Sequence, residues 1–296
     1  APYNAGMAVS TAVTVAPDVL VRGTGAVGLA AALALSRQGL RVALLGPLGP
    51  VPATSAMPAT PAASAGSAGS AASAASAAPP ATPQGTDIRA YALNGASVDL
   101  LTEIKVWEAL PAAARTQVHE MRIEGDDGDS VLEFSAWSSA LPELAWIVDA
   151  AALDSALRDA VRFAPHIERV AAPVAASLTL LAEGKDSATR TALGARMARR
   201  AYGHQAIAAR LVTTRPHAGL ARQWFRSPDV LALLPMDQPR RDHGLALVWS
   251  VPDERAAQLL VLSDEAFEAE LMQATAGAAG DLRIAGAAGD SHLAGA

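Results

Sequence analysis

The chain has 296 residues, of which 51% are hydrophobic, and its 23 Lys and Arg residues against 29 Asp and Glu residues give a formal net charge of −6. This length suits one composite domain or two smaller ones, and the acidic balance excludes nucleic acid as an expected partner. With no cysteine in the chain, disulfides, zinc–thiolate sites and a cysteine nucleophile are excluded as well. Any chemistry therefore has to come from other side chains or from a bound cofactor.

No stretch reaches the roughly 18 to 20 strongly apolar residues of a membrane span. The N-terminal segment has no Lys or Arg before Arg22, so the charged region of a secretory signal is missing. The six histidines are scattered and none has the HxxxH or HExxH spacing that places two imidazoles on one helical face. We therefore expect a soluble, cytoplasmic protein without a metal site.

The first predicted elements form a β-α-β unit. Residues 18–22 (DVLVR) and 41–45 (RVALL) are typical of buried strands, and residues 26–38 between them are typical of a helix. Gly39 stands where the glycine that ends a helix is expected. The unit spans about 30 residues, the size of a right-handed parallel crossover.

A glycine-rich turn, Gly23-Thr-Gly25-Ala-Val-Gly28, joins the first strand to the helix. It fits G-x-G-x-x-G in the setting that a dinucleotide site requires: Gly23 permits the tight turn, Gly25 lets a pyrophosphate approach the backbone, and Gly28 allows close helix–strand contact. The alternative is a turn of small residues that only packs. An acidic residue that binds the adenosine ribose is expected about 20 residues on, but Gly46 stands there, so such a site should bind more weakly or be completed from elsewhere.

The remaining elements follow a long stretch of Ala, Ser, Pro, Gly and Thr, which we interpret as a flexible insertion over residues 48–86. A helix that Asp149 caps carries Leu153, Leu157 and Val161 on one face. From residue 205 onward the hydrophobic pattern is typical of short strands, and it predicts a second lobe built on a sheet. The other predicted elements are a helix over 96–110, strands over 119–124 and 131–134 joined by a turn at 125–128, strands over 206–212, 231–234 and 245–250, and an amphipathic helix over 264–273.

Three further segments, together with the glycine turn, carry a family resemblance. Residues 87–94 (DIRAYALN), followed by Leu100, Leu101 and Val106-Trp107, look like the D-x-R-x-x-A-L-(S/N) segment and its helix, and residues 182–190 (AEGKDSATR) look like A-D-G-x-x-S-x-x-R with Glu for Asp. Residues 215–250 are similar to a substrate-lobe sheet, through Arg215-Pro-His217, Ala221, Trp224-Phe225, 231–236 (LALLPM) and Val248-Trp249-Ser250. In this order they resemble the FAD-dependent aromatic hydroxylases, the class A flavoprotein monooxygenases, and most closely the hydroxylases of polyprenylated phenols in ubiquinone biosynthesis. The resemblance covers residues 18–273 without the insertion.

The resemblance implies an α/β fold in which a Rossmann-like FAD-binding domain, the β-α-β unit with its GxGxxG turn, is interleaved with a smaller α+β sheet substrate domain. The FAD-binding domain would cover residues 16–204, with strands 119–134 belonging to the substrate lobe, the substrate-binding sheet would cover 205–275, and residues 276–296 would be a tail. By the same resemblance, Gly23, Gly25 and Gly28 would hold the FAD pyrophosphate, Arg89 would lie against the cofactor, and Glu183 with Gly184 would serve both flavin and NAD(P)H. Leu233 and Pro235 would line the substrate side.

Each of these assignments has a structural alternative. Arg89 is otherwise an ordinary surface cation, Glu183-Gly184 a plain turn, and Leu233 and Pro235 simple core. His217 is interpreted as a structural histidine rather than a base, and no catalytic side chain is named, because in such enzymes the cofactor carries the bond chemistry.

The implied activity is hydroxylation of an aromatic ring, with NAD(P)H reducing FAD and one atom of O2 entering the ring. The family's G-D-A-A-H-x-x-x-P segment should follow the last helix by several dozen residues, and Gly289-Asp-Ser-His292 lacks its proline and following helix, so the sequence predicts a C-terminally truncated copy. Two rivals remain: a catalytically silent homologue or non-enzymatic partner in a biosynthetic complex, and a nicotinamide-dependent dehydrogenase, which Gly46 disfavours. A polyprenyl substrate would favour peripheral contact with the inner membrane, although no basic amphipathic helix supports it.

Overall fold

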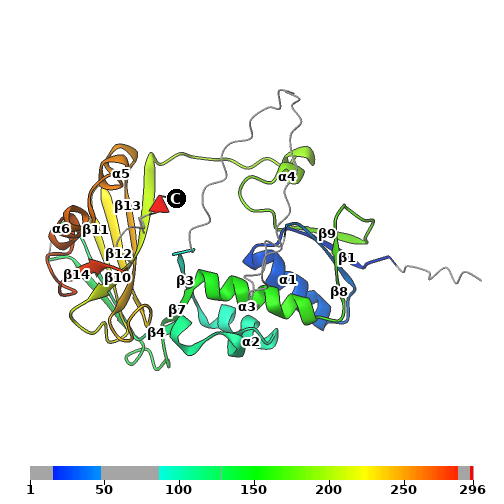
Figure 1. The fold of residues 1–296 in the computed structure, drawn as a ribbon, viewed down its shortest axis with the longest axis horizontal. Coiled ribbons are helices and arrows are strands. Elements are labelled where there is room, and N and C mark those ends of the chain that lie inside the picture. The colour runs from blue at the N-terminus through cyan, green and yellow to red at the C-terminus, as the bar shows by residue number, and fades with distance from the viewer. Residues whose placement is uncertain (1–15, 48–86, 128, 286–293, 296) are drawn as a thin grey trace, which may run out of the picture.

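A computed structural model describes residues 16–47, 87–127, 129–285 and 294–295 of the chain. The predicted insertion over 48–86 and the Gly289–His292 stretch lie outside the described residues. Figure 1 shows two lobes, one with a small parallel sheet and one with a large sheet, and a third small sheet between them. No helix in the described part of the chain is both long and apolar enough to cross a membrane.

The first lobe is built on a four-stranded sheet in the order β8-β2-β1-β9, and all of its pairs are parallel. The strands are β1 (Val19–Arg22), β2 (Val42–Leu45), β8 (Ile167–Val170) and β9 (Leu178–Leu181). Helix α1 (Ala26–Arg37) connects β1 to β2, which confirms the predicted β-α-β unit. Continuous apolar runs suit β1 and β2 because a parallel sheet is covered on both faces, and most of their residues are buried.

Helix α3 (Ala150–Phe163) packs beside α1 and completes the core of this lobe. As predicted, Leu153, Leu157 and Val161 form its buried face, and the side chain of Asp149 caps it by accepting a hydrogen bond from the backbone N–H of Ala152 at 2.8 Å. The apolar face of α3 is therefore buried by its contact with α1.

The predicted helix over 96–110 is shorter in the structure. Helix α2 (Gly95–Glu103) ends because Lys105 adopts a left-handed conformation (φ 62°), which lets the N–H of Val106 reach back to the carbonyl of Leu101 at 2.8 Å. A single 3₁₀ turn, η1 (Trp107–Ala109), follows, and the ring of Trp107 packs edge-on against Trp146 at 5.1 Å. A second 3₁₀ turn, η2 (Ala112–Ala114), and the short helix α4 (Ala188–Ala192) complete the connections of this region.

The middle sheet has three antiparallel strands in the order β3-β7-β4. They are β3 (Ala90–Leu93), β4 (Arg115–Val118) and β7 (Ala145–Asp149). Because β7 ends at the residue that caps α3, the middle sheet is tied directly to the core of the first lobe.

The second lobe is an eight-stranded sheet in the order β14-β10-β13-β12-β11-β5-β6, with β15 also paired to β10. All neighbours are antiparallel except β11 and β5, which are parallel. The strands are β5 (Glu120–Glu124), β6 (Val131–Ser135), β10 (His204–Thr213), β11 (Leu220–Arg226), β12 (Asp229–Met236), β13 (Gly244–Pro252), β14 (Leu282–Ile284) and β15 (Ala294–Gly295).

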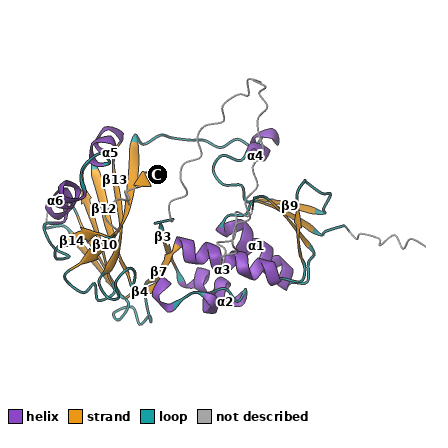
Figure 2. Cartoon of the chain, in the orientation of Figure 1, coloured by secondary structure: helices purple, strands orange, loops and turns teal. Residues whose placement is uncertain are grey.

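Two helices, α5 (Asp253–Leu259) and α6 (Asp264–Thr275), cover the outer face of this sheet (Figure 2). Trp249 and Phe267 meet edge-on there at 5.9 Å, within a buried cluster that contains side chains of β10 to β14, α5 and α6. A smaller cluster, formed by Val118, Ile147, Ala221, Met236 and Ala246, joins the inner face of the sheet to the middle sheet. The mixed α/β architecture predicted from the sequence is thereby confirmed.

Candidate cofactor site

The three glycines of the predicted turn meet three different environments. A Cβ atom on Gly23, which has φ 117°, would overlap the carbonyl oxygen of Ala182 at the end of β9, and one on Gly28 would overlap the carbonyl oxygen of Gly23. A Cβ on Gly25 would meet nothing within 4 Å. Gly23 and Gly28 are therefore required by close packing of strand, turn and helix, whereas Gly25 faces open space where a ligand could approach the backbone.

The turn leaves the beginning of α1 open. Gly25 is the N-cap residue, no described side chain caps the helix, and the first turn has no acidic residue. The first N–H groups of a helix lack intrahelical partners and lie at the positive end of its dipole. This helix start is consequently suited to an anion such as a pyrophosphate.

A cavity of about 420 Å³ opens beside the turn at the carboxyl ends of three adjacent parallel strands. It brings together Gly23, Gly25, Glu183 and Gly184, and is also lined by Arg22, Thr24, Leu45, Gly46, Pro47 and Ala182. Gly28 lies one layer deeper, against Gly23. Ligands of open α/β sheets bind at this edge, so four of the six residues predicted to bind a cofactor line one cavity.

Gly46, at the end of β2, explains why no ribose carboxylate stands at this position. Its φ of 147° favours glycine, and a Cβ there would lie 3.1 Å from the methyl carbon of Thr24. The hydroxyl of Thr24 donates to the carbonyl of Pro47 at 2.5 Å. A larger residue at 46 would be strained at this φ and would require Thr24 to shift by a few tenths of an ångström, so this site offers backbone atoms, not a carboxylate, beside the end of β2.

Glu183 is committed to contacts within the protein. Its carboxylate accepts from Arg22 Nε at 2.9 Å, from the Ser187 hydroxyl at 2.5 Å and from the Thr189 hydroxyl at 2.9 Å. The pKa of Glu183 lies below its ordinary value because the carboxylate accepts hydrogen bonds, first from the Ser187 hydroxyl and then from the Thr189 hydroxyl and the Arg22 guanidinium. Both carboxylate oxygens already have partners, so Glu183 braces Arg22 and the start of α4 in this structure.

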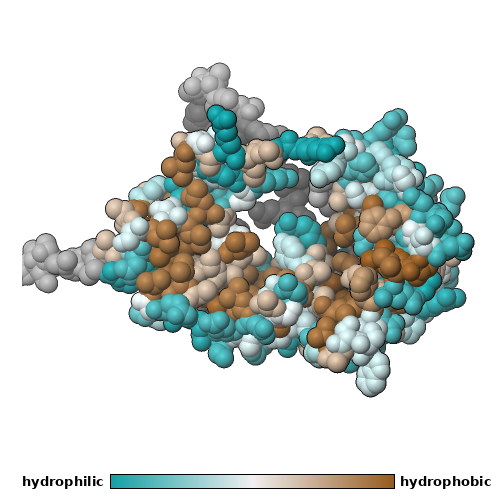
Figure 3. All heavy atoms as spheres, turned by 180° about the vertical axis from the view of Figure 1, so that it is seen from behind, coloured by the Kyte–Doolittle hydropathy of each residue, from teal (hydrophilic) through white to brown (hydrophobic). Residues whose placement is uncertain are grey.

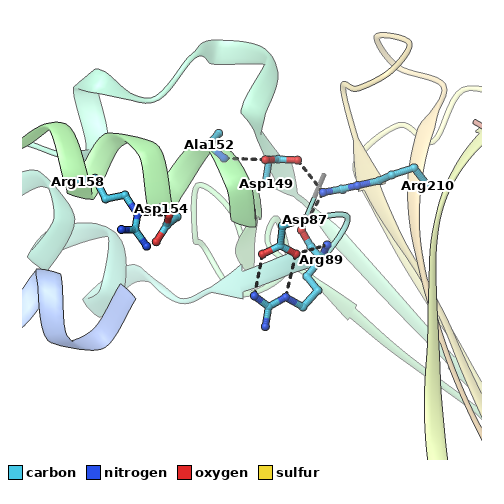
Figure 4. A network of polar contacts seen from close by, with 7 residues as sticks. All are labelled: Asp87, Arg89, Asp149, Ala152, Asp154, Arg158 and Arg210. Atoms are coloured by element: carbon cyan, nitrogen blue, oxygen red, sulfur yellow. Dashed lines mark hydrogen bonds and ion pairs between the residues drawn. The ribbon is translucent and has the colours of Figure 1, made fainter. Parts of the chain in front are cut away.

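Arg89 lies away from the glycine turn, where the first lobe meets the second (Figure 4). Its side chain is 61% exposed and forms a two-pronged ion pair with Asp87, with distances of 2.9 and 2.7 Å. Its backbone carbonyl accepts from Arg210 of β10 at 2.8 Å. The structure thus separates Arg89 from the other predicted cofactor residues and places it at the junction between the lobes.

Arg210 is the residue that ties the junction together, and the sequence did not single it out. Its guanidinium donates to Asp149 at 2.7 Å as well as to the Arg89 carbonyl, and the Arg210 and Asp149 side chains are only 12% and 15% exposed (Figure 4). Burial lowers the pKa of Arg210, and the charge of Asp149 opposes that effect. One buried ion pair therefore joins the cap of α3 to the large sheet.

Leu233 and Pro235 face away from that junction. Leu233 is 1% exposed and packs in the cluster beneath α5 and α6. Pro235, two residues farther along, lies on the same face of the strand. The neighbours Leu234 and Met236 contact the cluster that faces the middle sheet. The residues predicted to line a substrate thus lie on the outer face of β12, and the alternating residues of the same strand face the first lobe.

The inner face of the large sheet forms a partly exposed apolar surface. Cross-strand partners share a face, and the register aligns one row across six strands: Ala208, Val248, Ala232, Gln223, Ile123 and Leu132. None of these side chains is fully buried, and Val248 and Leu132 are 36% and 61% exposed. Seen from behind, apolar residues reach the surface on both lobes beside the hollow between them (Figure 3). Gln223 is the only polar member of this row, and no hydrogen bond of its side chain to another described residue is present.

His217 belongs to a second group of polar residues, with Asp237 and Asp242, whose possible metal-ligand atoms lie within 4.8 Å of one another. Its Nδ1 accepts from the backbone N–H of Gly219 at 3.1 Å, which places the proton of the neutral ring on Nε2, 3.6 Å from Asp237. Burial lowers the pKa of His217. In the neutral ring the nitrogen that faces the two carboxylates therefore carries a proton, and the structural role of His217 stays a prediction.

Comparison with known proteins shows which solved structures share this fold. No protein-family model matches the chain. Among solved structures, PqsL, a probable FAD-dependent monooxygenase from Pseudomonas aeruginosa, superposes with a TM-score of 0.62 at 17% identity over 95% of this chain and 72% of its own. The p-nitrophenol 4-monooxygenase PnpA from Pseudomonas putida gives 0.59 at 12% identity, covering 95% and 67%. A flavoprotein/dehydrogenase from Cytophaga hutchinsonii gives 0.62 at 12% identity, covering 94% and 66%.

At such low identities the likeness concerns the backbone rather than the site residues. It extends over both lobes, because each superposition covers more than nine-tenths of this chain. The fold that the four sequence segments imply is confirmed: the chain has the fold of these flavoenzyme structures.

Proposed function

We propose that the protein binds FAD and hydroxylates an aromatic ring, with NAD(P)H as the reductant. The observation that carries the proposal is the contrast among the three glycines: two are filled by packing, and Gly25 alone is open, at an uncapped helix start. Packing accounts for the glycines at positions 23 and 28 but places no demand on position 25.

The residues of the cavity fit the diphosphate part of such a cofactor. The backbone around Gly25 and the first N–H groups of α1 would hold the pyrophosphate, with Gly46, Pro47 and Gly184 forming the walls beside it. The ribose lacks its usual carboxylate at position 46, and both oxygens of Glu183 already accept hydrogen bonds within the protein. We therefore expect weaker binding of the adenosine part than a Rossmann site with that carboxylate provides.

The substrate would lie on the inner face of the large sheet. The exposed apolar row suits the apolar part of a phenol, and a polyprenylated phenol is the specific form that we propose. Gln223, in the middle of that row, is the side chain available to hydrogen-bond a ring hydroxyl.

Bound FAD would supply the redox chemistry: two electrons from NAD(P)H and the activation of O2, with one oxygen atom going to the ring and the other leaving as water. The chain itself contributes position and exclusion of water. Helix α1 would hold the diphosphate, and the apolar row would hold the ring and keep water from it. The Arg210–Asp149 pair joins the cap of α3 to the large sheet that carries this row.

A substitution at Gly25 tests the cofactor part without disturbing the fold. Gly25 has φ −76° and ψ 174°, so Gly25→Asp would place a carboxylate in normal N-cap geometry. We expect it to stabilise the apo protein by about 0.5–1 kcal/mol through the cap and the helix dipole, and to abolish FAD binding because its charge occupies the place of the pyrophosphate. Gly25→Ala adds the Cβ without the charge and should weaken binding less.

The measurements are flavin absorbance after gel filtration and calorimetric titration with FAD, NADH and NADPH. Bound FAD in the wild type, lost in Gly25→Asp, supports the proposal. A folded wild type that binds none of the three points to the silent homologue, and binding of a nicotinamide without FAD points to a dehydrogenase. Hydroxylation is then assayed with a 4-alkylphenol and NAD(P)H.

A further inference from the structure

Strand β11 carries an arginine with an unusual position on the outer face of the large sheet. Arg222 is half-buried and lies opposite Leu233 of β12 on one side and Arg122 of β5 on the other. This face is the one that α5 and α6 cover farther along the sheet. Arg222 is therefore held between an apolar neighbour and a like charge.

Within the described part of the chain, neither Arg222 nor the nearby Arg215 has a carboxylate partner. Arg122 pairs with Glu124 at 3.0 Å and Glu133 at 2.5 Å, but among the described residues no ion pair or hydrogen bond involves the guanidinium of Arg222 or of Arg215. Glu124, whose negative charge acts on Arg222, already accepts from Arg122 Nε and from the Trp224 indole at 3.0 Å each.

The electrostatic environment of Arg222 is accordingly unfavourable to its own charge. Burial lowers the pKa of Arg222, the charge of Glu124 opposes that effect, and the charges of Arg122 and Arg215 lower the pKa further. A partly desolvated cation without a direct ion-pair partner costs free energy. An anion that reached it would regain that free energy through charge-assisted hydrogen bonds.

A cavity of about 180 Å³ lies where such an anion would bind. Arg215 and Arg222 reach it, and its wall is otherwise apolar or neutral: Thr213, Pro216, His217, Ala218, Leu220, Leu233, Leu245, Ala278 and Ala279. No acidic residue lines it. A neighbouring depression of about 430 Å³ on the other side of Arg222 contains Glu120, Glu124 and Glu133, so the charge pattern favours an anion only in the smaller one.

We propose that this cavity, on the face of the sheet opposite the proposed substrate surface, binds a small soluble anion through Arg215 and Arg222. A volume below the roughly 300 Å³ of drug-sized pockets limits the ligand to inorganic phosphate or a short carboxylate such as succinate. The site goes beyond the proposed hydroxylase function and does not depend on it.

The test is calorimetric titration of the full chain with inorganic phosphate and with succinate, in a zwitterionic buffer at constant ionic strength. Because the start of α1 would also accept phosphate, the titrations are made in the Gly25→Asp background. We expect saturable binding that Arg222→Leu weakens at least tenfold and Arg215→Ala weakens less. Arg226→Leu is the matched control, since Arg226 lies on the same strand and face but is near a carboxylate, with Glu124 at 3.8 Å.

Thermal unfolding separates this site from an ordinary solvated arginine. Without anion, Arg222→Leu should unfold at the same or a higher temperature than its parent, because an uncompensated charge is removed. With phosphate, the parent and Arg226→Leu should gain stability while Arg222→Leu does not. Absence of saturable binding in the Gly25→Asp background, or equal weakening by Arg222→Leu and Arg226→Leu, would overturn the proposal.

Discussion

At the scale of single residues, Glu183 shows how a carboxylate in a cofactor motif can be absorbed by its own neighbours. Asp would have a shorter reach from the same backbone, whereas the longer Glu spans to Arg22 on β1 and to Ser187 and Thr189 beyond β9. These three contacts fix the edge of the cavity. Glu183 therefore contributes to the cofactor cavity by fixing the shape of its wall.

The lowered pKa of Glu183 predicts a specific pH dependence. A carboxyl group whose pKa is lowered by folding stabilises the protein above its unfolded pKa, and this contribution is lost as the pH falls through the folded pKa. At pH 7 we expect Glu183→Gln to lower the free energy of unfolding by about 1–2 kcal/mol, the order of a charged hydrogen bond, and the difference from wild type should shrink below about pH 4.5, near the unfolded pKa.

Urea unfolding at pH 7, 5, 4 and 3 measures this difference. Glu168→Gln is the control, because Glu168 lies on β8 of the same sheet with an exposed side chain. A Glu183→Gln deficit that stays constant from pH 7 to 3 would show that the charge of Glu183 has no part in it.

At the scale of elements, α3 depends on a residue that serves two partners. Asp149 accepts from the backbone of Ala152 at 2.8 Å and from Arg210 at 2.7 Å, so the same carboxylate begins the helix and holds the large sheet. A defect in either contact is therefore transmitted to the other.

Three substitutions separate the two roles of Asp149. Asp149→Asn keeps the cap but loses the charge, Asp149→Ala loses both, and Arg210→Met removes the partner. We expect Arg210→Met to cost roughly 3 kcal/mol, since it leaves a mostly buried carboxylate without its counter-charge. Asp149→Ala should cost about 1 kcal/mol more than Asp149→Asn, the value of an N-cap. Equal unfolding free energies for Asp149→Ala and Asp149→Asn would show that the cap contributes nothing.

The elements also show what local sequence can and cannot specify. The β-α-β unit, the face of α3 and the cap at Asp149 were predictable because their signals repeat within a few residues. Strand β11 was not predicted, because its alternating sets, Leu220, Arg222 and Trp224 against Ala221, Gln223 and Phe225, each mix apolar and polar residues. In such a strand the period of two gives no amphipathic pattern.

The candidate site was predictable only in part for a similar reason. Glycines 23, 25 and 28 follow from a local motif. No local motif predicts the face of the sheet on which Leu233 lies, because both faces of β12 are apolar. Only the pairing of β12 with distant strands determines which face meets the helices. The Arg22–Glu183 and Arg210–Asp149 pairs join residues 161 and 61 positions apart, and no spacing in the sequence indicates them.

At the scale of the whole molecule, the buried side chains fall into two large clusters and one small one. The first contains Leu157 and the cores of α1 and the parallel sheet, and the second contains Phe267 and the outer face of the large sheet. The five fully buried residues of the small cluster and the Arg210 pair join them. Each large cluster therefore has its own cooperative core.

Differential scanning calorimetry tests this division. We expect two transitions, with Leu157→Ala lowering only one of them and Phe267→Ala lowering only the other, each by an amount that corresponds to about 2–5 kcal/mol. One transition, moved alike by both variants, would instead mean that the two lobes unfold as a unit.

The uncapped start of α1 has a practical consequence for any affinity measured on this protein. Since no side chain among the described residues satisfies its first N–H groups, we expect ordinary buffer ions such as sulfate and phosphate to compete there with a dinucleotide. Dissociation constants obtained in phosphate-buffered saline should therefore be weaker than those obtained in a zwitterionic buffer, and crystals grown from sulfate would be expected to trap that ion beside Gly25.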